Sequence, residues 1–125
     1  MANTVLVQAL LQFFNAANIV TQFNFSGTSF AVSGDHFTQN TWTVPTTAGG
    51  TAIPLGGVAT PGGYMIVKNN DATNYVQIMA ATSGTPLIRI GPGEIAVFRL
   101  DAGATAPAAV SHTATCEITY IILDA

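Results

Sequence analysis

Residues 65–79 read MIVKNNDATNYVQIM, two apolar runs on either side of a cluster of Asn, Asp and Thr. With their flanking residues, the runs become GYMIVKN and NYVQIMA, which have the length of β-strands. The segment NNDAT between them supplies residues that tolerate positive φ and that cap their own backbone through Asx turns. The pattern therefore predicts a β-hairpin whose loop is NNDAT, in preference to an active site or a metal cradle.

Similar turn signals recur at short intervals along the chain, among them SG at 26–27, PGG at 61–63 and GPG at 91–93. Runs of strand length rich in Val, Ile, Phe, Tyr and Thr lie between them, which is typical of an all-β sandwich or barrel. The predicted strands cover residues 4–13, 19–25, 29–33, 37–44, 51–56, 63–68, 74–80, 86–90, 94–100 and 115–123.

Two segments are less regular. TVLVQALLQFFNAAN (4–18) contains Leu and Ala, which favour helix, but its apolar positions do not form one stripe. A strand is favoured there, with an N-terminal helix or arm over residues 1–14 as the alternative. DAGATAPAAVSHTAT (101–115) has no period and predicts a long loop. No repeat or linker divides the chain, so we expect one β domain over residues 1–125.

Strict alternation identifies the predicted inner faces. In FTQNTWTV (37–44), Trp42 and Val44 lie opposite Gln39 and Thr41. In TCEITYIIL (115–123), the period of two places four residues on one face, namely Cys116, Ile118, Tyr120 and Ile122. Cys116 is the single cysteine, so no intramolecular disulfide is possible, and we expect it to pack as a small buried side chain.

The charge content is unusually low. Apolar residues make up 49% of the chain and charged residues 7%, against about 25% charged in a typical soluble domain. Three basic residues cannot build the positive field that nucleic-acid binding requires. No apolar stretch has the length of a membrane-spanning helix, and no secretory signal is evident, so we expect neither nucleic acid nor membrane as a partner. A surface of uncharged polar residues suits a protein packed into a larger assembly.

Catalytic and metal-binding patterns are weak. SGDH (33–36) combines a hydroxyl, a carboxylate and an imidazole, but consecutive residues cannot aim their tips at one point, so a polar turn is favoured over a catalytic triad. The possible metal ligands His36, His112, Asp35 and Asp71 lack metal-site spacing. We therefore expect no enzymatic activity, no cofactor and no resident metal, while an ion shared between subunits stays open.

Two arginines lie in apolar strands. Arg89 shares a face with Leu87 in LIRI, and Arg99 lies in VFRL on the next predicted strand of the same hairpin. Either each arginine is solvated on an outer face, or it forms an ion pair within the chain or across a subunit contact.

Several segments in a familiar order resemble small virion structural proteins of tailed bacteriophages. They are TVPTTAGGTAIPLGGV (43–58), GYMIVKNNDATNYVQI (63–78), IRIGPGEIAVFRL (88–100) and the final CEITYIIL (116–123). The resemblance spans roughly residues 43–125 and includes no catalytic signature. It implies an antiparallel β-sandwich, jelly-roll-like, with about eight to ten strands.

The resemblance also implies a function as an expectation. The resemblance implies that this chain is a capsid decoration (cement) protein on the capsid surface of the virion, made in the host cytoplasm. It is expected to bind the major capsid protein or neighbouring virion proteins. A homo-oligomer is expected, with a trimer favoured. The alternative is a tail, collar or fibre component that binds a receptor or carbohydrate through Trp42 or Tyr64.

Candidate interface residues follow from the excess of aromatic side chains and from the two arginines. The candidates are Phe13, Phe14, Phe23, Phe25, Trp42, Arg89 and Arg99. The competing interpretation is that the aromatic residues all belong to the core.

Overall fold

The computed structural model describes residues 3–14, 20–32, 34, 36–101 and 105–124. The described chain is all β, and none of it forms a helix long and apolar enough to cross a membrane. The strands are β1 (Asn3–Phe14), β2 (Val20–Val32), β3 (Phe37–Val44), β4 (Thr51–Ala52), β5 (Tyr64–Asn69), β6 (Val76–Met79), β7 (Pro86–Ile90), β8 (Ile95–Arg99), β9 (Ala108–Ser111) and β10 (Cys116–Leu123).

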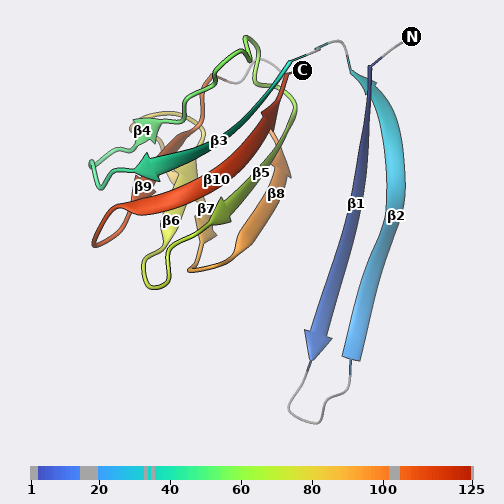
Figure 1. Ribbon diagram of the computed structural model, residues 1–125, viewed down its shortest axis with the longest axis horizontal. Helices are drawn as coiled ribbons and strands as arrows, with labels where there is room; N and C mark the ends of the chain where they lie inside the picture. Colours follow the sequence, from blue (N-terminus) through green and yellow to red (C-terminus); the bar gives the residue numbers. More distant parts are fainter. Residues whose placement is uncertain (1–2, 15–19, 33, 35, 102–104, 125) are drawn as a thin grey trace. The chain divides into compact units, whose positions relative to one another are not determined.

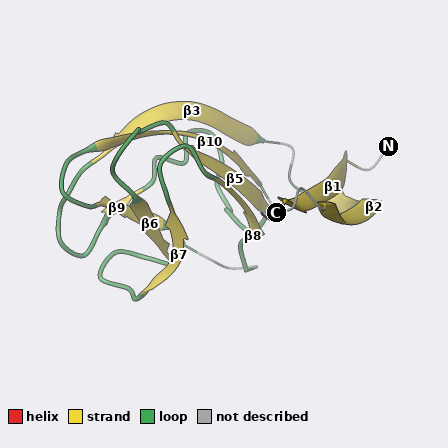
Figure 2. Ribbon diagram, turned by 90° about the horizontal axis from the view of Figure 1, so that it is seen from below, coloured by secondary structure: helices red, strands yellow, loops and turns green. Residues whose placement is uncertain are grey.

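Strands β3 to β10 form two four-stranded antiparallel sheets packed face to face (Figures 1 and 2). The first sheet has the order β3-β10-β5-β8 and the second β4-β9-β6-β7. β3 pairs with β10, β4 with β9, β5 with β8, and β6 with β7. Strands β3 to β6 thus pair antiparallel with strands β10 to β7, and the successive strand pairs alternate between the two sheets. This is the strand order of a jelly roll, and it confirms the expected β-sandwich.

The core lies between the two sheets and consists of side chains that alternate along each strand. On β10, Cys116, Ile118, Tyr120 and Ile122 are all buried, as the sequence predicts. The rest of the main core cluster is Val44, Ile53, Val58, Met65, Val67, Val76, Ile78, Ile90 and Ala109.

The first 33 residues form a separate compact unit. In it, β1 and β2 pair antiparallel from Asn3↔Val32 to Phe14↔Val20 as a two-stranded ribbon. The predicted strand over 4–13 is confirmed, and the helix alternative is wrong. The sandwich lies in the second unit, Gly34–Ala125. The expectation was a single domain over residues 1–125, whereas the chain divides into two compact units.

The predicted turn at SG (26–27) is wrong, because β2 runs through it. Between the pairs Val7↔Thr28 and Ala9↔Phe25, two residues of β2 stand opposite Gln8 alone, which is a β-bulge. A Cβ at Gly27 would lie 2.6 Å from Gln8 Cγ, so the glycine accommodates the side chain that crosses it. Within the described residues, the two predicted strands 19–25 and 29–33 are therefore one strand, β2.

Other corrections concern connections. β5 and β6 lie in different sheets, so NNDAT is a corner between the sheets and not a hairpin loop. The same holds for GPG, which connects β7 to β8. The predicted loop 101–115 contains β9, whose four residues are all buried. Its Ala-rich sequence shows no period of two because both faces of this inner strand are covered.

Candidate functional site

The polar corner after β5 is organised by Asn69, whose side chain is fully buried. Its Nδ2 donates to the carbonyl oxygens of Asn74 at 2.8 Å and of Ile90 at 3.2 Å. Its Oδ1 accepts a hydrogen bond from the backbone N–H of Asp71 at 2.9 Å. Because each polar atom is used within the fold, this amide is structural and is not available to a ligand.

Asp71 caps the next turn. Its Oδ1 accepts hydrogen bonds from the backbone N–H groups of Asn74 at 2.6 Å and Thr73 at 2.8 Å. These two bonds, the Asn74 bond first, lower the pKa of the Asp71 carboxyl below its usual 3.8. The predicted Asx turn is thus present, and the backbone occupies Oδ1 of its carboxylate.

The catalytic and metal hypotheses gain no geometry from the described residues. Ser33 and Asp35 lie outside them. The Nδ1 atom of His36 lies 3.9 Å from Oδ2 of Asp124. Among the described residues, no three His, Cys, Asp or Glu side chains gather into a possible metal site.

Arg89 belongs to a stacked cluster on the second sheet. Its guanidinium carbon lies 3.8 Å from the centre of the Tyr75 ring. The His112 ring stacks on the same ring at 4.4 Å with an interplanar angle of 17°. Two groups this close cannot share one ring face, so Tyr75 lies between them. His112 Nε2 also lies 2.5 Å from Gln77 Oε1, and this hydrogen bond holds the His112 ring in the stack.

Arg99 lies in the other sheet, where its guanidinium carbon is 5.9 Å from the centre of the Tyr64 ring. The expectation that both arginines lie on one hairpin is therefore wrong, because β7 and β8 belong to different sheets. Both side chains are exposed on outer faces, each with a cation–π contact to a tyrosine.

The outer face of the first sheet carries exposed apolar side chains. The register places Ile66 opposite both Ile121 of β10 and Val97 of β8, while Lys68 stands opposite Ile95. Ile95 is 61% exposed and Val97 55%. We call Ile66, Ile95, Val97 and Ile121 the outer patch. Consecutive apolar residues such as Met65, Ile66 and Val67 place every second side chain on the outer face of a strand, and this is the sequence signal of such a patch.

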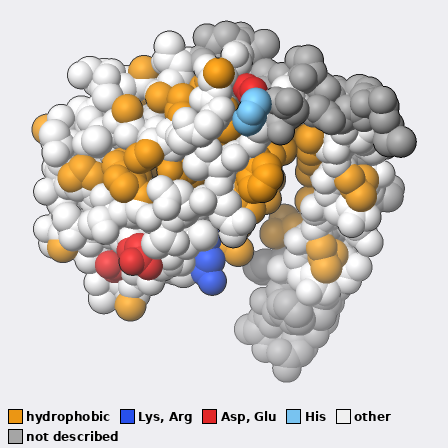
Figure 3. All heavy atoms as spheres, turned by 45° about the horizontal axis from the view of Figure 1, so that its top comes forward, with side chains coloured by type: hydrophobic (Ala, Val, Ile, Leu, Met, Phe, Trp, Pro, Cys, Tyr) orange, Lys and Arg blue, Asp and Glu red, His pale blue; other side chains and the backbone are white. Residues whose placement is uncertain are grey.

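A shallow groove of about 400 Å³ runs over part of this patch, between Ile66, Ile95 and Ile121. Thr and Asn side chains border it: Asn70 Nδ2 donates to Thr119 Oγ1 at 2.9 Å, and the Thr41 and Thr119 hydroxyls lie 3.2 Å apart. The space-filling view shows a surface dominated by uncharged atoms and apolar areas, with few charged groups (Figure 3). Lys68 also lines the groove and is its one charged residue. An apolar centre with a polar border that carries a single charge resembles the composition of a protein interface.

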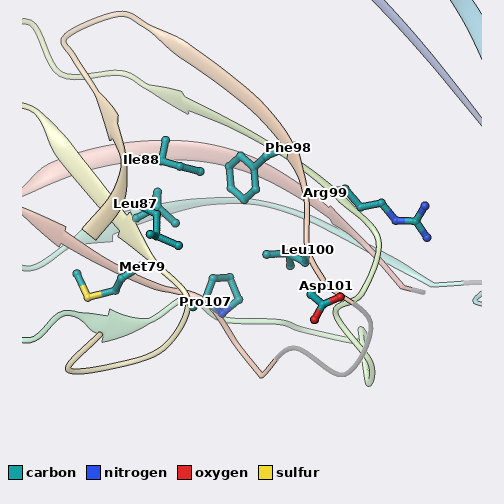
Figure 4. A pocket seen from close by; sticks show the side chains of 10 residues that line it. Met79, Leu87, Ile88, Phe98, Arg99, Leu100, Asp101 and Pro107 are labelled. Carbon is teal, nitrogen blue, oxygen red and sulfur yellow. The ribbon is translucent and has the colours of Figure 1, made fainter. Parts of the chain in front are cut away.

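A second pocket of about 280 Å³ opens where the edge strands β7 and β8 part, at one side of the sandwich. Figure 4 shows Phe98 and Leu100 directed toward it and Arg99 directed away, as alternation along a strand requires. Ile88, Met79 and Pro107 complete its apolar wall. The pocket connects the core to the surface. Its mostly apolar lining suits the binding of an apolar group and not of a polar ligand.

The other candidate interface residues are divided between the two units. Trp42 is half-buried and packs against the sandwich core. The remaining four belong to β1 and β2, where their side chains lie outside the described part of the structure; they are Phe13, Phe14, Phe23 and Phe25.

Comparison with known proteins gives no family model, no curated protein and no solved structure that matches this chain.

Proposed function

We propose that this chain is a non-enzymatic structural protein of a bacteriophage particle, and that it decorates the head by binding the major capsid protein or its neighbours. The observation that carries the proposal is the outer patch, an exposed apolar area on the first sheet of a jelly roll. Jelly rolls are common in viral shells, and the sequence segments 43–125 resemble phage virion proteins. A fold alone does not define a function, so the patch and the charge content bear most of the argument.

The physical role follows from mass action. A protein that binds only the assembled shell stabilises that shell by the free energy of its binding. Low charge favours broad contacts between neutral polar and apolar surfaces, because few ionic groups must lose their hydration on binding. The outer patch supplies the apolar centre of such a contact, and the surrounding Thr and Asn side chains supply hydrogen bonds.

The test is co-sedimentation with isolated heads of the phage whose genome carries this coding sequence. The wild-type protein is expected to pellet with the heads and to raise the temperature at which they release their DNA. Val97→Lys places a charge in the outer patch and is expected to weaken binding at least tenfold. Leu87→Lys is the matched control, since Leu87 is 73% exposed on the other sheet.

Two results contradict the proposal. Wild-type protein that stays in the supernatant does not decorate heads. Equal binding by Val97→Lys and wild type removes the outer patch from the contact. Binding to host cells or to purified host polysaccharide, without binding to heads, instead supports the tail, collar or fibre alternative.

A further inference from the structure

We infer that the β1–β2 ribbon is an intermolecular assembly element, and that its partner is the same ribbon of further copies of this chain. The inference deepens the proposed function by naming the element that joins copies of this chain to one another. It rests on that function only through the expected homo-oligomer. Four features of the ribbon lead to it: its unpaired edges, its exposed leucines, its lack of charge and its area.

The first feature is the outer edge of each of the two strands, β1 and β2. The ribbon is a two-stranded sheet of 12 and 13 residues, so within the described chain each strand pairs on one side only. The other side of each strand presents a row of backbone N–H and C=O groups that can pair with another strand. An isolated two-stranded hairpin is at best marginally stable in water, so a ribbon of this length needs further strands or a packed face.

The faces are apolar as well. Leu10 is 58% exposed and Leu11 65%. Successive residues of a strand point to opposite faces, so each face of the ribbon carries an exposed leucine. Leu6 is exposed to a similar extent, and no described side chain of β1 is buried. The segment 1–34 also holds five of the seven phenylalanines of the chain.

The absence of charge identifies the partner. Residues 1–34 contain no Asp, Glu, Lys, Arg or His, and the first proline of the chain is Pro45. Natural edge strands are usually protected from one another by lysines, inward charges, prolines or β-bulges, and of these devices the ribbon has only the bulge opposite Gln8. A neutral ribbon offers no attraction to a charged partner, whereas two copies of it meet without repulsion and with identical strands to align. The Gln12 side chain, which donates to Gln22 across the ribbon at 2.9 Å, shows the kind of neutral polar pairing that a copy can extend.

The area indicates how much must be covered. At about 3.3 Å per residue and about 4.8 Å between strands, the ribbon measures roughly 40 Å by 10 Å, so each face offers roughly 400 Å². A stable specific interface buries about 800 Å² on each partner. Both faces, or one face together with the edges, must therefore be covered, which favours an oligomer in which each ribbon contacts more than one neighbour.

The experiment compares the full-length wild type with the double variant Leu10→Glu/Leu11→Glu, which places one charge on each face of the ribbon. The matched control is Leu87→Glu on the sandwich, a leucine of equal or greater exposure. Mass is measured by light scattering over a hundredfold range of concentration, and hydrogen exchange is followed for the peptide covering β1. No heads are present, so the outcome is independent of the head-binding test.

The wild type and Leu87→Glu are expected to form the same oligomer, with β1 amides protected at high concentration and exposed on dilution. The double variant is expected to be monomeric at every concentration, with unprotected β1 amides and an unchanged near-ultraviolet signal from Trp42. A monomeric wild type overturns the inference, as does an oligomer that survives in the double variant. Loss of the oligomer in Leu87→Glu with retention in the double variant also overturns it, since the sandwich then makes the contact.

Discussion

The side-chain amide of Asn69 donates a hydrogen bond to the carbonyl oxygen of Ile90, 3.2 Å away. Asn69 ends β5 of the first sheet, whereas Ile90 ends β7 of the second. The backbone of Asn69 also pairs with the GPG corner, accepting from Gly93 N at 3.1 Å and donating to Glu94 O at 3.0 Å. One buried residue therefore joins two corners at which the chain passes from sheet to sheet.

Replacement of Asn69 by alanine is expected to destabilise the sandwich by about 2–3 kcal/mol, because the buried carbonyl of Ile90 and two partly buried backbone groups at the corner lose their partner. Urea unfolding followed by Trp42 fluorescence measures the change. Asn70→Ala is the matched control, since Asn70 is an exposed neighbour whose side-chain bonds lie at the surface. Equal effects of the two substitutions would contradict the role assigned to Asn69.

The GPG corner depends on a glycine in the left-handed region. Gly93 has φ of 74°, and no atom beyond its two chain neighbours lies within 4 Å of the place where its Cβ would stand. Gly93→Ala is therefore expected to cost about 1–2 kcal/mol through backbone strain and not through a clash. Gly57→Ala serves as the comparison, because its Cβ would approach only His36 Cδ2, at 4.0 Å. A Gly93→Ala protein as stable as Gly57→Ala would show that the corner relaxes freely.

Tyr120 makes stability depend on alkaline pH. Its hydroxyl donates to Pro54 O at 2.5 Å, and burial raises the pKa of the phenol above its usual 10.0, a shift that the Asn40 side chain partly offsets. The folded state thus holds this proton more tightly than the unfolded chain. Its contribution to stability is fully present below about pH 10 and is lost as the pH rises through the raised pKa.

Tyr120→Phe is accordingly expected to lower the free energy of unfolding by about 1 kcal/mol at neutral pH, because Pro54 O loses its donor. Between about pH 8 and about pH 11, the variant should lose less stability than the wild type, as the titrating group is gone. Denaturant unfolding at each pH gives both values. Identical pH profiles for the two proteins would rule out the buried phenol as a source of the dependence.

The sandwich should fold without the ribbon. All the buried apolar residues identified in the described chain lie between Val44 and Ile122. A fragment of residues 34–125 is expected to unfold in one cooperative transition, with a midpoint within a few degrees of that of the full-length chain. Calorimetry and near-ultraviolet circular dichroism test this. A fragment without a cooperative transition would show that the ribbon contributes to the sandwich core.

The local structure of the sandwich can be read from the amino-acid sequence alone. Alternation with a period of two depends only on which side chains face the core, so it predicted most strands, the buried face of β10 and the packing of Cys116. Turn chemistry is equally local, and it correctly located the Asx turn at Asp71 and the corner at Gly93. The lack of charge over residues 1–34 can likewise be read directly from the sequence.

Strand pairing, in contrast, depends on the complete fold. NNDAT and GPG have the chemistry of hairpin loops, yet each connects two sheets, because β5 pairs with β8 and β6 pairs with β9, which are strands distant in sequence. β9 was missed because small residues buried on both faces leave no alternation. The outer patch, and the open edges of β1 and β2 within the described residues, also depend on strand order, since a strand's pairing and exposure are decided by residues distant in sequence.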